Sequence, residues 1–341
     1  MIRQTSRSKK LVWVGLAFSA ILLWVVLKNV DVQEIRSAFI SIDYKYVVVS
    51  GVAIAVGMSL RAIRWRLIAK GPYADHSKFA SATYLGVLSN LIFPARAGEV
   101  IRILNISDAT LFPLSRAVAS AMIDRFADIV VLAFSALLVY FHTPAAAILG
   151  QWLSILVIAI FVLCAAIALS VWRGELLRDW GGTLLRRVLR KWALRPEIFL
   201  AEFFSELKGL VRGTSALKIV TVGIAIWCMD YAVVAFIIMS LGLSLPVEAP
   251  LMLWVFLAAG SALPSAPGYV GVYQIAAILA LSFYNVASSS AVAVALALQL
   301  TTIVAALLMS ASALVGLLAR KNSCCSSQQP ESQAVGARKI D

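Results

Sequence analysis

The sequence predicts an all-α polytopic membrane protein with about six spanning helices and two re-entrant helical hairpins in an inverted repeat. Of its 341 residues, 61% are hydrophobic and only 14% are charged, whereas a soluble domain carries about a quarter charged residues. Several apolar stretches exceed about 18 residues, which is enough to cross a bilayer. Two pairs of shorter apolar stretches are each interrupted by the spacing Pro-x-x-x-Gly.

The spanning helices are expected where apolar stretches reach bilayer length. The first follows the basic stretch RQTSRSKK, and since no small-residue cleavage site comes after it, we interpret it as an uncleaved span. The six predicted spans are 11–27, 46–66, 113–141, 146–172, 218–241 and 288–319. They form one predicted domain, 1–322, which is followed by a disordered tail, 323–341.

Basic residues predict the orientation of these spans. Lys and Arg are frequent at the N-terminus, after the second span, in 173–217 and after the last span. They are absent from the loops 142–147, 242–249 and 285–289. Because cytoplasmic loops carry an excess of Lys and Arg, we expect both termini and 173–217 to face the cytoplasm. Segment 28–45 is expected outside, although its own Lys and Arg do not follow this rule.

The polar insert 173–217 contains two amphipathic patterns, LLRRVLRKW and IFLAEFFSELKGLV. One interpretation is that they bind the anionic inner leaflet of the membrane. The other is that the insert is a solvated linker between two spans. The net charge of the chain is +13, and since such charge is typical of cytoplasmic loops, it does not indicate nucleic-acid binding.

Two interrupted stretches, LIFPARAGEVIRI and SALPSAPGYVGVY, resemble each other. Each places a proline four residues before a glycine, Pro94 before Gly98 and Pro264 before Gly268, and helices break at such residues. The apolar pieces on either side are 79–93 with 100–112, and 250–263 with 268–284. Since most of these pieces are shorter than the roughly 20 residues needed to cross a bilayer, we interpret them as two re-entrant hairpins.

In the predicted orientation the first hairpin enters from the cytoplasm and the second from outside. The units 46–141 and 218–319 therefore run in opposite directions, and such inverted repeats are the architecture of many transporters. We expect the two breaks to approach each other, because broken backbone at membrane depth must be surrounded by protein or water. The alternative is two ordinary helical hairpins with proline kinks, which gives the same loop orientation.

Ionisable side chains lie within or beside these apolar stretches, where an isolated charge costs about 2.5–3.5 kcal/mol. They are Arg61, Arg64, Arg96, Glu99, Arg102, Asp124, Arg125, Asp128 and Asp230. Glu99 and Arg102 are three residues apart, and Asp124 and Asp128 are four apart, so each pair shares a helix face. We therefore expect these charges to pair with one another or to lie in water.

Two interpretations of these charges stay open. The structural one is a set of buried ion pairs that fixes the hairpin, for instance Arg96 with Asp124, while Arg61 and Arg64 extend to the cytoplasmic headgroups. The functional one is a polar cavity for an anionic group, because the planar guanidinium fork of arginine matches phosphate. The helix that begins near Gly98 would add the positive end of its dipole. Asp230 is expected to line the interior or to pair.

Four strings in this order, RAIRWRLI, GVLSNLIFPARAGEVIR, DRFAD and PSAPGYVGVYQ, resemble the family named for the transmembrane region of lysylphosphatidylglycerol synthases, over about residues 10–320. The resemblance implies a flippase-like module that moves lipids or lipid-linked molecules between leaflets. Carried over by position, the family motif falls on Arg64, Trp65, Asn90, Pro94, Arg96, Gly98, Glu99, Arg102, Arg125, Asp128, Pro267, Gly268 and Gly271. The chain departs from the family at Asp124, where Glu is common, and near Gln274, where an acidic residue is frequent.

The leading hypothesis is a carrier in a bacterial inner membrane that moves a phospholipid or a lipid-linked anionic headgroup, without a cofactor, a metal or a catalytic residue. Arg96, Arg102 and Arg125 would hold the phosphate, and Glu99, Asp124 and Asp128 would neutralise them in the empty site. Arg64, Asn90, Gly98, Asp230, Gly268 and Gln274 complete the predicted substrate site. A membrane glycosyltransferase or lipid phosphatase is the second hypothesis. The third is an accessory scaffold for a lipid-modifying enzyme, and the sequence also leaves open a homo-oligomer.

The predicted orientation can be tested by cysteine labelling of intact cells with a membrane-impermeant reagent. We expect labelling of single cysteines placed in 142–147 or 242–249, because these loops lack the basic residues of cytoplasmic segments. Cysteines placed in 180–195 should be labelled only after the membrane is permeabilised. Their labelling in intact cells would contradict this orientation.

Overall fold

A computed structural model of the protein describes residues 31–69, 75–93, 97–107, 112–142, 214–261 and 266–326, with isolated positions at 24, 28, 158 and 203. Nearly all of the predicted spans 11–27 and 146–172 and of the insert 173–217 lies outside the described residues. The same holds for Pro94, Arg96 and Pro264. The last helix continues to Ser326 and so includes the start of the predicted tail.

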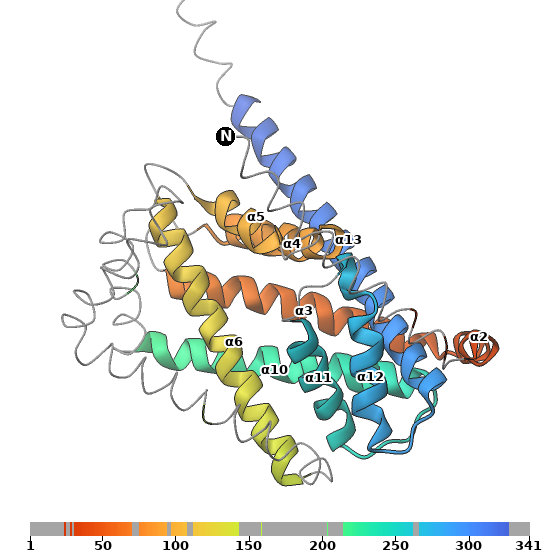
Figure 1. The fold of residues 1–341 in the computed structure, drawn as a ribbon. Coiled ribbons are helices and arrows are strands. Elements are labelled where there is room, and N and C mark those ends of the chain that lie inside the picture. The colour runs from red at the N-terminus through yellow and green to blue at the C-terminus, as the bar shows by residue number, and fades with distance from the viewer. Residues whose placement is uncertain are drawn as a thin grey trace, which may run out of the picture.

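The elements of the described residues are all helices, as the sequence predicts. They are α2 (Val32–Ile40), α3 (Tyr44–Ala69), α4 (His76–Ile92), α5 (Ala97–Ile106), α6 (Leu114–His142), α10 (Thr214–Ser240), α11 (Glu248–Ser261), the 3-10 helix η2 (Pro267–Tyr269), α12 (Val272–Ser282) and α13 (Ser288–Ser326). In chain order, a long helix, two short helices and a second long helix occur twice: α3 to α6, and α10 to α13 (Figure 1).

Three helices of the described residues are long and apolar enough to cross a membrane: Tyr44–Ala69, Ala216–Ser240 and Ser288–Val315. They coincide with three of the predicted spans, so the prediction of a helical membrane protein is confirmed. The fourth predicted span in this part of the chain, α6, is 29 residues long. It is not one of these three helices, and it carries charged side chains, among them Asp124, Arg125 and Asp128.

The four short helices lie where the sequence predicts the two hairpins, and they pack in two pairs, α4 with α5 and α11 with α12. Their lengths are 17 and 10 residues in the first hairpin and 14 and 11 in the second. At a rise of about 1.5 Å per residue, each helix is about 15–25 Å long. A hydrocarbon core is about 30 Å thick, so none of the four reaches across it along its own axis.

Positive φ angles mark the break of the second hairpin. Gly268 has φ 68°, Tyr269 has φ 60° and Gly271 has φ 84°. A left-handed conformation is accessible to glycine without strain, which explains two of the three residues. This break contacts α4 of the other hairpin, and a Cβ added to Gly268 would lie 3.7 Å from the carbonyl oxygen of Leu91. The second break therefore lies beside the last turn of α4, just before the first break.

Helix α2 was not expected from the sequence, which predicts only that 28–45 is polar and lies outside. Asp31 caps this helix, since its carboxylate accepts a hydrogen bond of 2.7 Å from the backbone N–H of Gln33. The backbone N–H of Asp31 in turn donates to the hydroxyl of Ser289, at 3.4 Å. The second of these bonds, together with the packing of α2 on α13, holds the start of α2 against the start of α13.

Helices α3 and α10 are antiparallel neighbours (Figure 1). Near one end the backbone N–H of Asp43 donates to the carbonyl of Ser240 at 2.8 Å. Further along, the hydroxyl of Ser50 donates to the carbonyl of Val233 at 3.2 Å, and the guanidinium of Arg61 contacts Asp230. From the first of these contacts to the last, residue numbers rise in α3 and fall in α10. The first helices of the two units therefore run in opposite directions.

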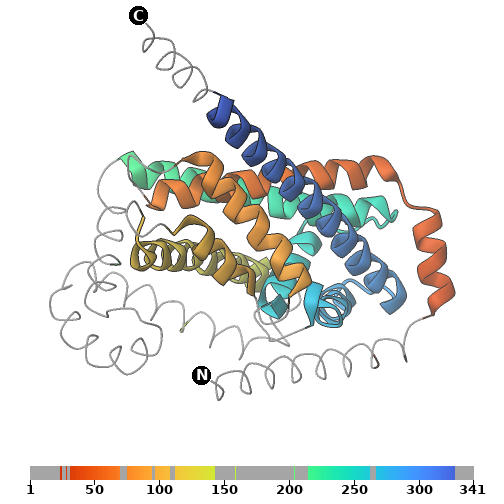
Figure 2. The ribbon, with the colours of Figure 1, turned by 90° about the horizontal axis from the view of Figure 1, so that it is seen from above.

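Contacts within and between the two units correspond. α3 packs on α4 as α10 packs on α11, and α5 packs on α6 as α12 packs on α13. Each hairpin also contacts the last long helix of the other unit: α4 packs on α13 and α11 packs on α6. Figure 2 shows α13 crossing the region of α3 and α4, and α13 contacts both helices.

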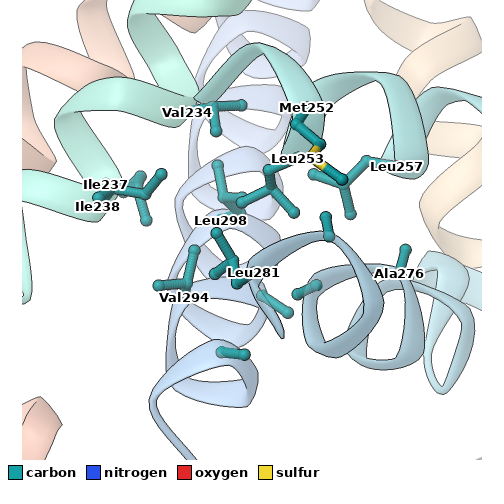
Figure 3. Packing of buried hydrophobic residues seen from close by; sticks show 14 of the residues in the cluster. Val234, Ile237, Ile238, Met252, Leu253, Leu257, Ala276, Leu281, Val294 and Leu298 are labelled. Atoms are coloured by element: carbon teal, nitrogen blue, oxygen red, sulfur yellow. The ribbon is translucent and has the colours of Figure 1, made fainter. Parts of the chain in front are cut away.

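Among the described residues, the largest cluster of buried apolar side chains comes from α10, α11, α12 and α13 and from the C-terminal half of α6. Figure 3 shows Val234, Ile237, Met252, Leu253 and Leu281 pointing toward one another from α10, α11 and α12. Val294 and Leu298 from α13 close the same cluster. The second hairpin is therefore held by the largest of the apolar clusters, whereas the first packs in two smaller ones and also carries charged side chains.

Gly98→Ala tests the close approach of α4 and α5. A Cβ at Gly98 would overlap the carbonyl oxygen of Gly86 and lie 2.6 Å from the side-chain oxygen of Asn90. We expect the variant to lose about 1–3 kcal/mol of stability through overpacking, measured as a lower melting temperature of the detergent-solubilised protein. Gly223→Ala is the matched control, because a Cβ there meets nothing within 4 Å. Equal melting temperatures of the two variants would contradict the packing.

Candidate functional site

Six charged side chains from three helices meet beside the first hairpin. We call this group the charge cluster: Arg64 from α3, Glu99 and Arg102 from α5, and Asp124, Arg125 and Asp128 from α6. All six were predicted from the sequence, and the structure brings them together although they span more than 60 positions of the chain. Three arginines face three carboxylates, so the cluster is neutral as a whole.

Asp124 is the centre of the cluster and is almost fully buried. One carboxylate oxygen accepts a hydrogen bond from Nε of Arg64 at 2.9 Å, and the other accepts one from Arg102 at 3.3 Å. The side chains of Asp124, Arg64 and Arg102 are 1%, 2% and 5% exposed. Arg64 is thus buried and forms the base of the cluster with Asp124, whereas one sequence interpretation placed it at the headgroups.

Arg102 is also supported by an aromatic ring. Its guanidinium lies 4.5 Å from the centre of the Trp65 ring, which is a cation–π contact. The Trp65 Nε1–H donates to the hydroxyl of Ser120 at 3.2 Å, and this fixes the ring between α3 and α6. Ser120 lies four residues before Asp124 and therefore on the same face of α6. Neither the ring contact nor Ser120 was predicted.

The other three members form a half-exposed rim. Arg125, Asp128 and Glu99 have side chains that are 40%, 31% and 28% exposed. Asp128 is well satisfied, because one oxygen accepts from Arg64 at 2.5 Å and the other from Arg125 at 3.0 Å. The cluster is therefore closed at its base and accessible at its rim.

Glu99 is held less well than the two aspartates. Its Oε2 lies 3.1 Å from Nε of Arg102 and 3.4 Å from Nε of Arg125. Both Nε atoms are buried, and in the described part of the chain neither finds a hydrogen-bond partner. The predicted pairing of Glu99 with Arg102 is present as a charge contact, but it leaves two guanidinium donors unused.

A second ion pair joins the two units. Arg61 donates to both carboxylate oxygens of Asp230, at 2.8 and 2.6 Å. This explains the charge within α10, which the sequence predicted to line the interior or to pair. Arg61 and Arg64 are one helical turn apart on α3, so the pair adjoins the charge cluster.

In both hairpins a side-chain amide oxygen accepts a hydrogen bond from the backbone N–H of a glycine. In the first, the side-chain oxygen of Asn90 accepts from the N–H of Gly98 at 2.8 Å. In the second, the side-chain oxygen of Gln274 accepts from the N–H of Gly271 at 2.7 Å, and its nitrogen donates to Gln299 at 2.7 Å. Gln299 in turn donates to the carbonyl of Gly268 at 2.8 Å.

These bonds occupy the amide of Gln274, which is buried. Gln274 and Gly268 therefore hold the second break in shape, and across the described residues no hydrogen bond or ion pair links them to the charge cluster. Pro267 begins η2. Gln299 was missed by the sequence analysis, although an amide in the middle of an apolar span was a signal for it.

The described ranges contain no group of three or more His, Cys, Asp and Glu residues that could hold a metal ion. What the cluster offers chemically is a set of fixed arginine donors with carboxylates that balance them. Such donors bind the oxygens of phosphate or carboxylate groups.

The chain matches the family model described as the lysylphosphatidylglycerol synthase TM region over residues 12–310. It is also 25% identical over 293 residues to glycosyltransferase AglD from Haloferax volcanii. That match covers 77% of this chain but 47% of the relative, so the chain spans about half the length of the curated protein it matches. No solved structure matches the chain.

Asp124→Asn tests whether the base of the cluster supports the fold. The change leaves Arg64 and Arg102 buried without their shared counter-charge, which costs about 3–5 kcal/mol for a buried pair. We expect a large fall in melting temperature and in yield of folded protein. Glu34→Gln, at an exposed position of α2, removes the same charge away from the cluster and should leave both unchanged. Similar stability of the two variants would contradict this role of Asp124.

Proposed function

The chain belongs to the lysylphosphatidylglycerol synthase transmembrane-region family, and from this we propose that it is a lipid carrier of the bacterial inner membrane. It moves a phospholipid or a lipid-linked anionic headgroup from one leaflet to the other. The headgroup passes the charge cluster, while the acyl or prenyl tails stay in lipid. The substrate's phosphate is held by Arg102 and Arg125.

The observation that carries this proposal is the incomplete pairing of arginines in an otherwise closed charge cluster. Arg64 and Asp124 satisfy each other at the buried base. Arg102 and Arg125 each keep one buried N–H without an acceptor in the described residues. An unused buried guanidinium donor is costly unless an acceptor is supplied. The phosphate of a lipid headgroup supplies several acceptor oxygens in the geometry that arginine binds best.

We further propose that the two units form an inverted repeat of re-entrant hairpins. The antiparallel packing of α3 and α10 and the corresponding contacts of the two units support this arrangement. The contact of η2 with α4 supports a meeting of the two breaks. In transporters built this way, the substrate site lies at the interface of the repeats, near the middle of the bilayer.

An enzyme is the second candidate, because one relative is named a glycosyltransferase. That name does not place the activity in the matched part, since the match covers less than half of the relative. A scaffold that assists a separate lipid-modifying enzyme is the third candidate. A carrier, an enzyme and a scaffold give different results in one experiment with the reconstituted protein.

Leaflet transfer in liposomes that contain the purified protein and labelled phosphatidylglycerol tests the proposal. We expect transfer of the lipid with its mass unchanged. Arg125→Lys keeps the charge but loses the bidentate fork, so the variant should fold normally and transfer lipid at least about tenfold more slowly, which corresponds to about 1.4 kcal/mol.

Arg36→Lys, at an exposed position of α2, is the matched control and should transfer lipid like the unmodified protein. A change of lipid mass without transfer would support the enzyme instead. Neither transfer nor chemical change, for phosphatidylglycerol or a prenyl phosphate lipid, would support the scaffold.

A further inference from the structure

We infer that Glu99 is a built-in competitor of the substrate: its carboxylate occupies the place of a lipid phosphodiester between Arg102 and Arg125 and is displaced when the lipid binds. This inference deepens the proposed function, because it rests on the same anion site. The inference also specifies that the bound group of the substrate carries one negative charge.

Glu99 differs from the other carboxylates of the cluster in how it is bound. Both oxygens of Asp124 and both oxygens of Asp128 accept hydrogen bonds from arginines. For Glu99, by contrast, the closest contacts with its two arginines are ion pairs of Oε2 with Nε of Arg102 and Nε of Arg125, and both of these Nε–H groups stay without a hydrogen bond in the described residues. Glu99 is thus the carboxylate that the cluster can release at the lowest cost.

The position of Glu99 also allows it to leave. Its side chain is 28% exposed, and Arg125 beside it is 40% exposed, whereas Arg102 on the other side is 5% exposed. Arg102 is fixed by Asp124 and by the Trp65 ring. When the Glu99 carboxylate turns toward the rim, a buried and immobile arginine donor and a more accessible one remain for the incoming oxygen.

The charge balance indicates what kind of anion fits. Among the described residues, three arginines and three carboxylates cancel, and the adjoining Arg61–Asp230 pair is neutral as well. Within this described set, release of Glu99 leaves one uncompensated positive charge. A phosphodiester carries one negative charge, so it restores neutrality, whereas a pyrophosphate would leave the site negative. A second carboxylate cannot share the site with the phosphodiester, because like charges repel.

Binding of short-chain phosphatidylglycerol to the purified full chain, measured by isothermal titration calorimetry, tests this inference. Glu99→Gln removes the competitor, so we expect about tenfold tighter binding together with slower leaflet transfer in liposomes, because the lipid is released more slowly. Glu34→Gln makes the same change of charge at an exposed position of α2 and should alter neither quantity.

If Glu99 only holds the hairpin, its loss leaves Arg102 and Arg125 repelling each other, and binding is then unchanged or weaker. Either result would overturn the inference. Tighter binding of inorganic phosphate with none for the lipid would contradict the assignment to a lipid phosphodiester. Tighter lipid binding without leaflet transfer by the unmodified protein would instead contradict the proposed carrier and leave the competitor in place.

Discussion

Charge compensation at Asp124 is the constraint on which the first hairpin depends. A buried carboxylate is costly unless donors surround it, and Asp124 meets this requirement with Arg64 of α3 and Arg102 of α5. The same two bonds tie three helices together, at a point where α5 is only 10 residues long. A helix this short is marginal by itself, so its position is set by the charges it carries and by its close packing on α4 at Gly98.

The two hairpins use similar hydrogen bonds near their breaks but differ in their surroundings. In each, a side-chain amide accepts from the N–H of a glycine at the break, Asn90 for Gly98 and Gln274 for Gly271. The first hairpin then meets the charge cluster, whereas the second is buried in apolar side chains and a neutral amide pair. In the proposed carrier, the binding chemistry is therefore concentrated on the first unit, and the second unit supplies a neutral wall.

Hydropathy predicted the apolar spans Tyr44–Ala69, Ala216–Ser240 and Ser288–Val315 within a few residues, because a long apolar run needs no partner to be recognised. Helix spacing predicted that Asp124 and Asp128 share a face, and both indeed contact Arg64. The identity of partners was less accessible, since Arg61 and Asp230 lie 169 positions apart and nothing local connects them. Helix α2 was missed because it is only 9 residues long, although its cap at Asp31 and the helical spacing of Val32, Ile35 and Phe39 were readable signals.

The central claim is that the rim charges bind substrate and do more than hold the fold. The double variant Arg125→Gln with Glu99→Gln tests it most directly, because it removes one charge of each sign and keeps the cluster neutral. Melting temperature and leaflet transfer of phosphatidylglycerol should be measured on the same reconstituted preparation. We predict a melting temperature within a few degrees of the unmodified protein and loss of transfer. A folded double variant that transfers lipid at the full rate would show that these charges serve the fold alone.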